Sequence, residues 1–260
     1  MFIDLRGKQL FFRKIPSTFE RFYTEREEEQ IVKQLYNQHT FNGDSVRVEH
    51  VEVKGDKALV VISPSKFYQL LTTTLIVNRN TDDLPPKAQE YQSKVGEDLG
   101  SIEKVLSNKL LSNDTTVSVM VKDREGNYLL ARRGAKVAVG TSLLSTTVTG
   151  SVDGDDIDEE NPIKNAVIRE VEEELHIQPE DIEVEIIGIF MGDVKVQPVF
   201  ICNATYNGVF DDEWLDNSMG LSDENKYFNK LTPEELSNYR VARGRLTEAG
   251  VFHLDIIKGG

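Results

Sequence analysis

The spacing of apolar residues in the first part of the chain predicts a β-hairpin and a helix. Residues 46–53 alternate apolar and polar side chains, and residues 57–63 form a mostly apolar run after the Gly55-Asp56 turn. Two such runs joined by a tight turn are typical of a hairpin. Residues 24–36 instead have apolar side chains at helical spacing, after an N-cap candidate, Thr24, and several acidic residues. Short strands and helices are therefore expected to alternate here.

Breaks in this pattern place a domain boundary near residues 112–114. The dipeptide Ser63-Pro64 is expected to open a short helix, and residues 87–111 are expected to be helical with interruptions near Gly96 and Gly100. We therefore predict a smaller α+β domain at residues 1–112 and a second domain at residues 113–260.

The second domain is predicted to place strands around one long amphipathic helix. Strands are expected at residues 115–121 and 128–132, with three more polar strand-like pieces at 134–151. After an acidic loop, a helix is expected to begin at Pro162 and to end near Leu175. The pattern ends with two more strands and another helix, expected at residues 182–191, at residues 199–206 and from Thr232 onward.

Charge and composition narrow the possible classes of function. The 260 residues include 30 Lys and Arg against 44 Asp and Glu, which gives a net charge of −14. Because this charge repels polyphosphate backbones, general nucleic-acid binding is not expected. The single cysteine, Cys202, excludes an intrachain disulfide framework. The sequence has no signal-peptide pattern and no apolar run of membrane-spanning length, so we expect a cytoplasmic protein without a membrane partner.

Three glutamates converge on one face of the helix predicted at residues 162–175. At helical spacing Glu170, Glu173 and Glu174 lie together beside an apolar face, whereas Glu172 points elsewhere. A solvated acidic face is the simplest interpretation of such a helix. However, like charges at i,i+3 and i,i+4 repel each other, and Lys164 is too distant to neutralise them. Converging carboxylates suit Mg²⁺ or Mn²⁺, so we predict a metal site at the three residues.

The same segment resembles the Nudix hydrolases, whose pattern is G-x5-E-x7-R-E-U-x-E-E-x-G-U, with U a bulky aliphatic residue. Residues 169–177 match the second half of this pattern, except that His176 stands at the second glycine. In the first half, Gly154 and Glu160 have the family's separation, but eight residues rather than seven separate Glu160 from Arg169. The surrounding strands are also similar to the Nudix layout, so the resemblance covers residues 113–257.

The resemblance implies an α/β/α sandwich with a mixed sheet and a Mg²⁺-dependent hydrolase. The carboxylates of Glu170, Glu173 and Glu174 would then hold the metal, and Glu170 and Glu174 would take part in catalysis. The guanidinium of Arg169 would pair with Glu160 and hold the helix against the loop that contains Gly154. Water bound to such a metal has a lowered pKa, so that hydroxide attacks phosphorus at neutral pH.

Members of this family often use a further carboxylate from a later loop as a ligand or base. By position this residue would be Glu224, which immediately precedes an expected strand. The residues Glu213 and Asp216 compete for the role, and an ordinary surface acid is the simplest interpretation of Glu224 taken alone.

Candidate substrate contacts lie in both domains. The neighbouring Arg132 and Arg133 end a predicted strand, where one of them faces the sheet and could bind phosphate oxygens, although a surface pair explains them equally well. In the first domain, Tyr68 could stack on a base, and the hydroxyls of Thr73 and Thr74 could bind sugar or phosphate. These residues give the first domain a possible role in substrate recognition.

The order of elements before residue 113 is similar to that of the Nudix proteins that split UDP-glucose into UMP and glucose 1-phosphate. We therefore expect a small-molecule nucleoside diphosphate derivative as substrate, preferably a nucleotide sugar, with ADP-ribose or another nucleotide as the alternative. A Nudix module that senses a nucleotide without cleaving it is the other class considered. A site that no longer binds metal can lose glutamates that repel each other. Because all three glutamates are present together with Arg169, the sequence favours an enzyme.

Overall fold

The computed structural model describes residues 1–36, 40–95, 99–133, 143–193, 195–218, 225–240 and 246–259, apart from the side chains of Arg133, Ser218, Asn225 and Lys226. The chain forms two compact units. The first unit comprises residues 1–116, 151–162 and 189–199, and the second comprises residues 117–150, 163–188 and 200–260. The first unit thus extends past the expected boundary at residue 112 and takes in two later segments. Both units combine helices with sheets, which confirms the predicted α+β class.

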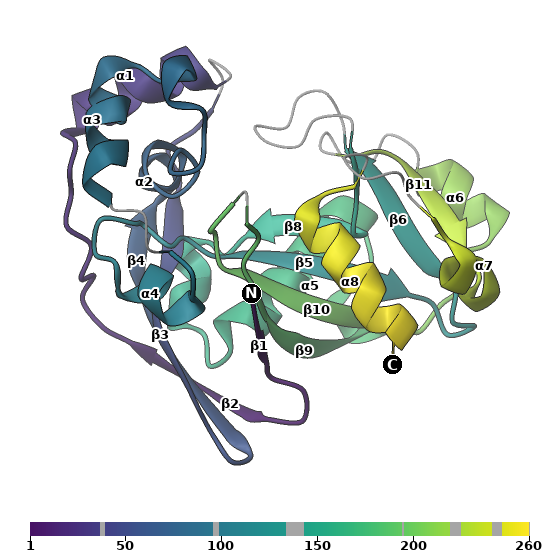
Figure 1. Cartoon of the computed structure of the whole chain (residues 1–260). Coiled ribbons are helices and arrows are strands. Elements are labelled where there is room, and N and C mark those ends of the chain that lie inside the picture. Colours follow the sequence, from purple (N-terminus) through teal and green to yellow (C-terminus); the bar gives the residue numbers. More distant parts are fainter. Residues whose placement is uncertain are drawn as a thin grey trace. The chain divides into compact units, whose positions relative to one another are not determined.

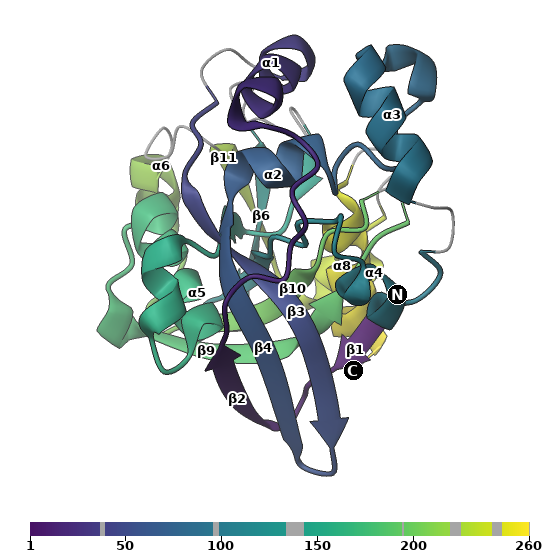
Figure 2. The ribbon, with the colours of Figure 1, turned by 90° about the vertical axis from the view of Figure 1, so that its left-hand side faces the viewer.

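The first unit is built on a three-stranded mixed sheet. In the order β2-β4-β3, β2 pairs with β4 in parallel and β3 pairs with β4 antiparallel. Figure 2 shows the three strands side by side. The elements of this unit are β1 (Phe2–Asp4), β2 (Gln9–Lys14), α1 (Glu25–Leu35), β3 (Asp44–Lys54), β4 (Lys57–Lys66), α2 (Phe67–Thr72), η1 (Thr81–Asp83), α3 (Pro86–Val95), α4 (Ile102–Ser107) and η2 (Gly154–Asp158).

The predicted hairpin, the first helix and the short helix after Ser63-Pro64 are confirmed, but the short helix begins at Phe67 and not at Ser63-Pro64. The turn between β3 and β4 contains Gly55 with a φ of 59°, a conformation that glycine adopts without strain. Strand β4 continues through Pro64, and helix α2 begins only at Phe67. The pairing of β2 with β4 ends at Lys14 and Ile62, so Pro64 lies where β4 has become an edge on that side. Proline is tolerated at such a position because its missing N–H leaves no ladder bond unmade.

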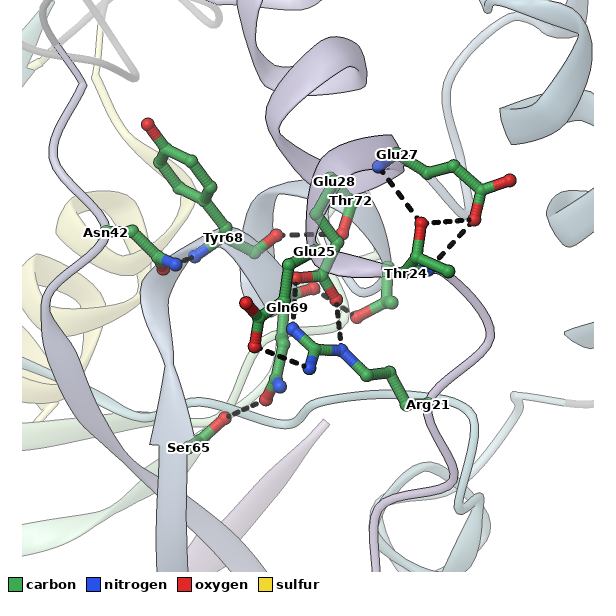
Figure 3. Close-up of polar contacts among 11 residues, drawn as sticks. Arg21, Thr24, Glu25, Glu27, Glu28, Asn42, Ser65, Tyr68, Gln69 and Thr72 are labelled. Carbon is green, nitrogen blue, oxygen red and sulfur yellow. Dashed lines mark hydrogen bonds and ion pairs between the residues drawn. The ribbon is translucent and has the colours of Figure 1, made fainter.

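Helix α1 begins as the sequence predicts and carries one buried acid. The Thr24 hydroxyl accepts a hydrogen bond from the Glu27 backbone N–H, and the Glu27 side chain accepts one from the Thr24 backbone N–H, which forms a capping box. The buried Glu28 carboxylate lies 2.7 Å from Nη2 of Arg21 (Figure 3). This ion pair compensates the cost of burying the Glu28 charge against the apolar side of α1.

The interior of the first unit contains a buried ion pair. The fully buried Arg47 side chain places Nε 3.1 Å from Oε2 of Glu49 and donates from Nη1 to the Leu111 carbonyl. Burial alone would raise the pKa of Glu49, but hydrogen bonds from Ser63 and Thr18, together with the charge of Arg47, outweigh burial and lower it. The Glu49 carboxylate is therefore the ionised partner of Arg47.

A second carboxyl in the same interior, Asp114, has a pKa that is shifted in the opposite direction. The Ser45 hydroxyl donates to Oδ2 of Asp114 at 2.7 Å. Burial nevertheless raises the pKa of Asp114 to about 7, although hydrogen bonds from Ser65 and Ser45 and the charge of Arg47 act in the other direction. The folded state thus holds a proton on Asp114 that an unfolded chain, with its ordinary value of 3.8, has already released at pH 5.

We expect Asp114→Asn to flatten the pH dependence of stability. A raised folded pKa favours the folded state at low pH, and this contribution is lost as the pH rises from about 4 to about 7. In Asp114→Asn, the fall in unfolding free energy between pH 5 and pH 8 should be smaller than in the parent by roughly 1–3 kcal/mol. Urea unfolding at both pH values measures the difference, with the exposed Asp56→Asn as a control. Parallel curves for Asp114→Asn and the parent would contradict the assignment.

The second unit contains a larger sheet and the long helix α5 (Figure 1). Its strands follow the order β9-β10-β5-β6-β11, with β7 on β6 and β8 on β5. Helices α6 and α7 contact β11, and α8 contacts β7. The elements are β5 (Thr116–Lys122), β6 (Tyr128–Arg133), β7 (Leu144–Ser145), β8 (Val148–Ser151), α5 (Pro162–Leu175), η3 (Pro179–Asp181), β9 (Ile182–Phe190), β10 (Val199–Tyr206), α6 (Asp212–Ser218), β11 (Asn225–Leu231), α7 (Pro233–Asn238) and α8 (Glu248–Gly259).

The hairpin of β5 and β6 is fixed by Asp123 at its turn. The carboxylate accepts hydrogen bonds from the backbone N–H groups of Asn127 and Phe210 at 2.8 and 3.1 Å. Burial acts to raise the pKa of Asp123, but these bonds and the Asn127 side chain outweigh burial and lower it.

Among the helices of the described residues, none has the length and apolar composition that a membrane span needs.

Candidate functional site

Helix α5 forms where the sequence predicts it and buries one apolar side. The helix begins at Pro162, whose fixed φ suits the first turn, and ends at Leu175. Its inner side consists of Ile163, Ala166, Val167, Val171 and Leu175, each with at most 1% of its surface exposed. This packing fixes the rotation of the helix about its axis, and the rotation decides which glutamates are covered.

Helix α5 is followed by a residue in the left-handed region, His176. The φ of His176 is 54°, in the left-handed region, and its N–H donates to the Glu172 carbonyl at 2.9 Å. This conformation costs a residue other than glycine roughly 1 kcal/mol. The helix exit at His176 therefore carries an energetic cost that a glycine there would not have.

The three glutamates of the predicted metal site differ in burial. The carboxylate-bearing side chains of Glu170 and Glu174 lie one helical turn apart and are both buried. In contrast, the Glu173 side chain is 61% exposed. Two buried carboxylates at i,i+4 repel each other more strongly than they would in water, because the surrounding dielectric is lower. Helix α5 thus concentrates negative charge at Glu170 and Glu174.

The guanidinium of Arg169 contacts two of these glutamates. Its Nη1 lies 2.8 Å from Oε1 of Glu170 and 3.7 Å from Oε2 of Glu173. The predicted partner Glu160 belongs to the first unit and is exposed, whereas Arg169 belongs to the second. The pairing of Arg169 with Glu160 stays a prediction.

A close neighbour of the site that the sequence analysis did not select is Gly150, at the end of β8. A Cβ atom built on Gly150 would lie 1.9 Å from Cδ of Glu170 and 2.1 Å from Oε1. Any side chain at this position would therefore displace the Glu170 carboxylate, which occupies the space that a Cβ atom would fill. The signal available in the sequence was a lone glycine between a strand-like piece and the acidic loop.

We expect Gly150→Ala to disturb the site more than the fold. The atom in conflict with the new methyl group is the flexible end of Glu170, so the carboxylate has to swing away while the backbone stays in place. The apparent affinity for Mg²⁺ should fall roughly tenfold or more, as for other changes that reorient a metal ligand. Calorimetric titration with Mg²⁺ and a melting curve test this. In the control Gly259→Ala, a Cβ atom meets nothing within 4 Å. An unchanged Mg²⁺ affinity in Gly150→Ala would contradict the expectation.

The carboxylates of α5 are of the ligand type that a hard divalent cation prefers, but their side chains are not arranged as a complete coordination site. Glutamate oxygens are ligands that Mg²⁺ and Mn²⁺ prefer, and the Glu170 carboxylate lies against the backbone at Gly150. Within the described ranges, no three His, Cys, Asp or Glu side chains are grouped closely enough to hold a metal ion. A metal bound here would draw on Glu170 and Glu174, with Glu173 turned inward from its exposed position.

The remaining predicted site residues of the second half of the chain are only partly described. The residue Glu224 and the side chain of Arg133 lie outside the described part of the structure. The competing acids Glu213 and Asp216 are exposed on α6. The exposed guanidinium of Arg132 donates from Nη1 to the Tyr227 hydroxyl at 3.2 Å on the neighbouring strand β11. This contact leaves Arg132 at the surface, where an anion can reach it.

The predicted substrate residues of the first unit have partners within the protein. The Tyr68 hydroxyl donates to the Thr40 carbonyl at 2.7 Å. The backbone N–H of Tyr68 donates to Oδ1 of Asn42 (Figure 3). The hydroxyls of Thr73 and Thr74 are buried and accept hydrogen bonds from the backbone N–H groups of Ser112 and Asn113, respectively, both at 3.2 Å. The two threonines thus hold the 112–113 segment against α2, a structural role that the sequence did not suggest.

Comparison with known proteins gives matches among solved structures only. No protein-family model and no curated protein sequence matches the chain. A hydrolase of the NUDIX family from Clostridium perfringens shares 19% identity over 56% of this chain and 97% of its own, with a TM-score of 0.38. The MutT protein from Methanosarcina mazei shares 18% identity over 56% and 93%, with a TM-score of 0.38. A NUDIX hydrolase from Alicyclobacillus acidocaldarius shares 11% identity over 56% and 91%, with a TM-score of 0.41. At this level of similarity, the function has to be inferred from the residues of α5 and their neighbours.

Proposed function

We propose that this protein is a Mg²⁺-dependent hydrolase of the Nudix type that cleaves the pyrophosphate bond of a nucleoside diphosphate linked to another moiety. The observation that carries the proposal is the pair of buried carboxylates, Glu170 and Glu174, one turn apart on α5. Two ionised carboxylates one turn apart repel each other, and the Arg169 guanidinium lies against one of them, Glu170. A bound cation would turn that repulsion into coordination.

We assign different roles at the site to the residues of α5 and to two residues outside it. The carboxylates of Glu170 and Glu174 would hold the metal, and Glu173 would complete the set. The bound ion supplies polarisation of a phosphate oxygen and a lowered pKa for a coordinated water. The guanidinium of Arg169, 2.8 Å from Glu170, keeps that carboxylate in a defined orientation. The exposed Arg132 would bind a substrate phosphate, and Glu224 would serve as the general base.

The preferred substrate class is a nucleotide sugar of the UDP-glucose type, which would give UMP and a sugar 1-phosphate. The order of elements in the first unit supports this choice over a generic nucleotide, as does the half-buried Tyr68, whose ring could stack on a base or sugar. Hydrolysis of ADP-ribose is the alternative within the same reaction class. The net charge of −14 agrees with a small substrate whose phosphates are neutralised locally by metal and arginine.

The test is product release from UDP-glucose, ADP-ribose and a panel of related nucleotides, with Mg²⁺ or with EDTA. We expect turnover of at least one nucleotide sugar that depends on Mg²⁺ and stops in EDTA. Binding of a nucleotide without turnover would instead indicate a sensing module. Absence of both binding and turnover across the panel would refute the proposal.

A further inference from the structure

The loop that leads into α5 is bound to strand β3 within the first unit. The Val46 N–H donates to the Val152 carbonyl at 3.1 Å, the Val152 N–H donates to the Thr115 carbonyl at 3.2 Å, and the Thr115 N–H donates to the Val46 carbonyl at 2.8 Å. Each of these three segments thus donates to one neighbour and accepts from the other, although they are far apart in the sequence. The start of β3 therefore belongs to the support of the 151–158 loop.

The side chain of Asp44 also packs closely against the backbone of the loop at Gly154. A Cβ atom built on Gly154 would lie 2.5 Å from Cβ of Asp44, closer than real atoms of this type approach. The Asp44 carboxylate is held in place by Nζ of Lys66 at 2.6 Å. The described positive φ angles of glycine are at Gly7, Gly55 and Gly126, so the backbone conformation of Gly154 does not require a glycine. The close approach of Asp44 is what requires it.

The loop is also ordered by a hydrogen bond within it and by an ion pair to strand β2. The Asp153 N–H donates to Oδ2 of Asp156 at 2.9 Å, which closes a capping box over η2. A second tie joins Lys14 on β2 to Asp158. The segment from Asp153 to Asp158 is therefore attached to the sheet of the first unit at both ends, and residues 159–161 connect it to Pro162, the first residue of α5.

We propose that Asp44 is a positioning residue for the active site, acting through Gly154 on the loop that leads into α5. This inference rests on the proposed function, because it assigns the N-terminal strand a role in ordering the approach to Glu170 and Glu174. Asp44 touches neither substrate nor metal in this role. Its contribution is the fixed packing surface against which the glycine of the loop is seated.

The test adds a methyl group at residue 154 and then removes the side chain of residue 44 that this methyl group meets. In Gly154→Ala the new methyl group collides with Cβ of Asp44, and in Asp44→Gly/Gly154→Ala the colliding atom is gone and the nearest remaining atom, the Asp44 carbonyl carbon, lies at 3.7 Å. The variant Asp44→Gly alone is the reference for the double variant. Gly43→Ala is the matched control, because a Cβ atom there would lie 3.6 Å from the Phe41 ring, an ordinary contact.

Activity and hydrogen exchange are both measured. We expect Gly154→Ala to lower kcat roughly 10- to 100-fold and to raise the Mg²⁺ concentration needed for half-maximal rate, with KM changed little, because the site and not substrate binding is displaced. Amide exchange at Val152 should accelerate. The double variant should return kcat and exchange to within a few-fold of Asp44→Gly, and Gly43→Ala should match the parent. If Gly154→Ala does not fold, refolding of the double variant supports the proposal, and failure of both overturns it.

The two proposals fail in different ways. A parent protein without Mg²⁺-dependent turnover would remove the proposed function and the positioning role with it, and exchange at Val152 would then report only the packing of Asp44 against Gly154. An active parent whose Gly154→Ala variant keeps its kcat, Mg²⁺ dependence and exchange rates would overturn the positioning role. Loss of activity that Asp44→Gly does not rescue would overturn it as well.

Discussion

Replacing Arg47 with alanine is expected to lower the free energy of unfolding by about 3–5 kcal/mol, the usual cost of removing one partner of a buried ion pair. The guanidinium is fully buried and serves both the Glu49 carboxylate at 3.1 Å and the Leu111 carbonyl. Its removal leaves an ionised carboxylate and a carbonyl without that donor in the interior. The ring of Phe19, 5.9 Å from the guanidinium carbon, also loses a contact.

Chemical denaturation at pH 7 measures this effect. The matched control is Arg13→Ala, because Arg13 is exposed on β2 and its loss should change stability by less than about 0.5 kcal/mol. The double variant Arg47→Met/Glu49→Gln removes both charges and should recover part of the loss, since a buried pair replaced by neutral groups of similar volume is often tolerated. An Arg47→Ala protein as stable as Arg13→Ala would show that the pair contributes nothing to the first unit.

The substitution Glu174→Gln is expected to reduce kcat by at least about 100-fold while the protein remains folded. Loss of a residue that merely orients a metal ligand costs 10- to 100-fold, so loss of a ligand charge should cost no less. Glutamine has nearly the same volume as glutamate, and the buried position of Glu174 is therefore filled as before. Relief of the repulsion from Glu170 should stabilise the metal-free protein by a few tenths of a kcal/mol.

The control for this substitution lies on the same helix. The exposed Glu172 should tolerate replacement by glutamine with full activity and unchanged melting. Turnover at saturating Mg²⁺ and melting in EDTA are compared for the parent and both variants. Full activity of purified, folded Glu174→Gln would end the proposed metal role of Glu174, and equal losses in both variants would point to a general effect of charge on the helix.

The sequence by itself determined the local elements of the site. Apolar residues at helical spacing, with Pro162 at the start, predicted that α5 begins at Pro162 and ends near Leu175, and the same spacing put Glu170, Glu173 and Glu174 on adjoining faces. Periodicity, capping and turn preferences are properties of neighbouring residues, so a linear sequence carries them.

Contacts between distant segments were decided by the tertiary structure. Helical spacing puts Glu174 next to the apolar side of α5 and Glu173 away from it, but how far each is covered depends on what packs against the helix, and in the structure Glu174 is buried and Glu173 is exposed. Likewise, the hydroxyl of Thr73 resembles a ligand group in the sequence, whereas in the structure it accepts a hydrogen bond from the Ser112 N–H. Burial and partners depend on which segments pack together, and that choice is made by the whole core.

The largest gap between sequence and structure concerns the loop before α5. Composition and breaks predicted a boundary at residue 112, with the acidic loop assigned to the second domain, but residues 151–162 are part of the first compact unit. The hydrogen bonds that join Val152 to Val46 and Thr115 are the physical reason, because each closes between segments that no local pattern relates. The glycine requirements at Gly150 and Gly154 have the same origin: each arises from a side chain, Glu170 or Asp44, that folding brings against the backbone.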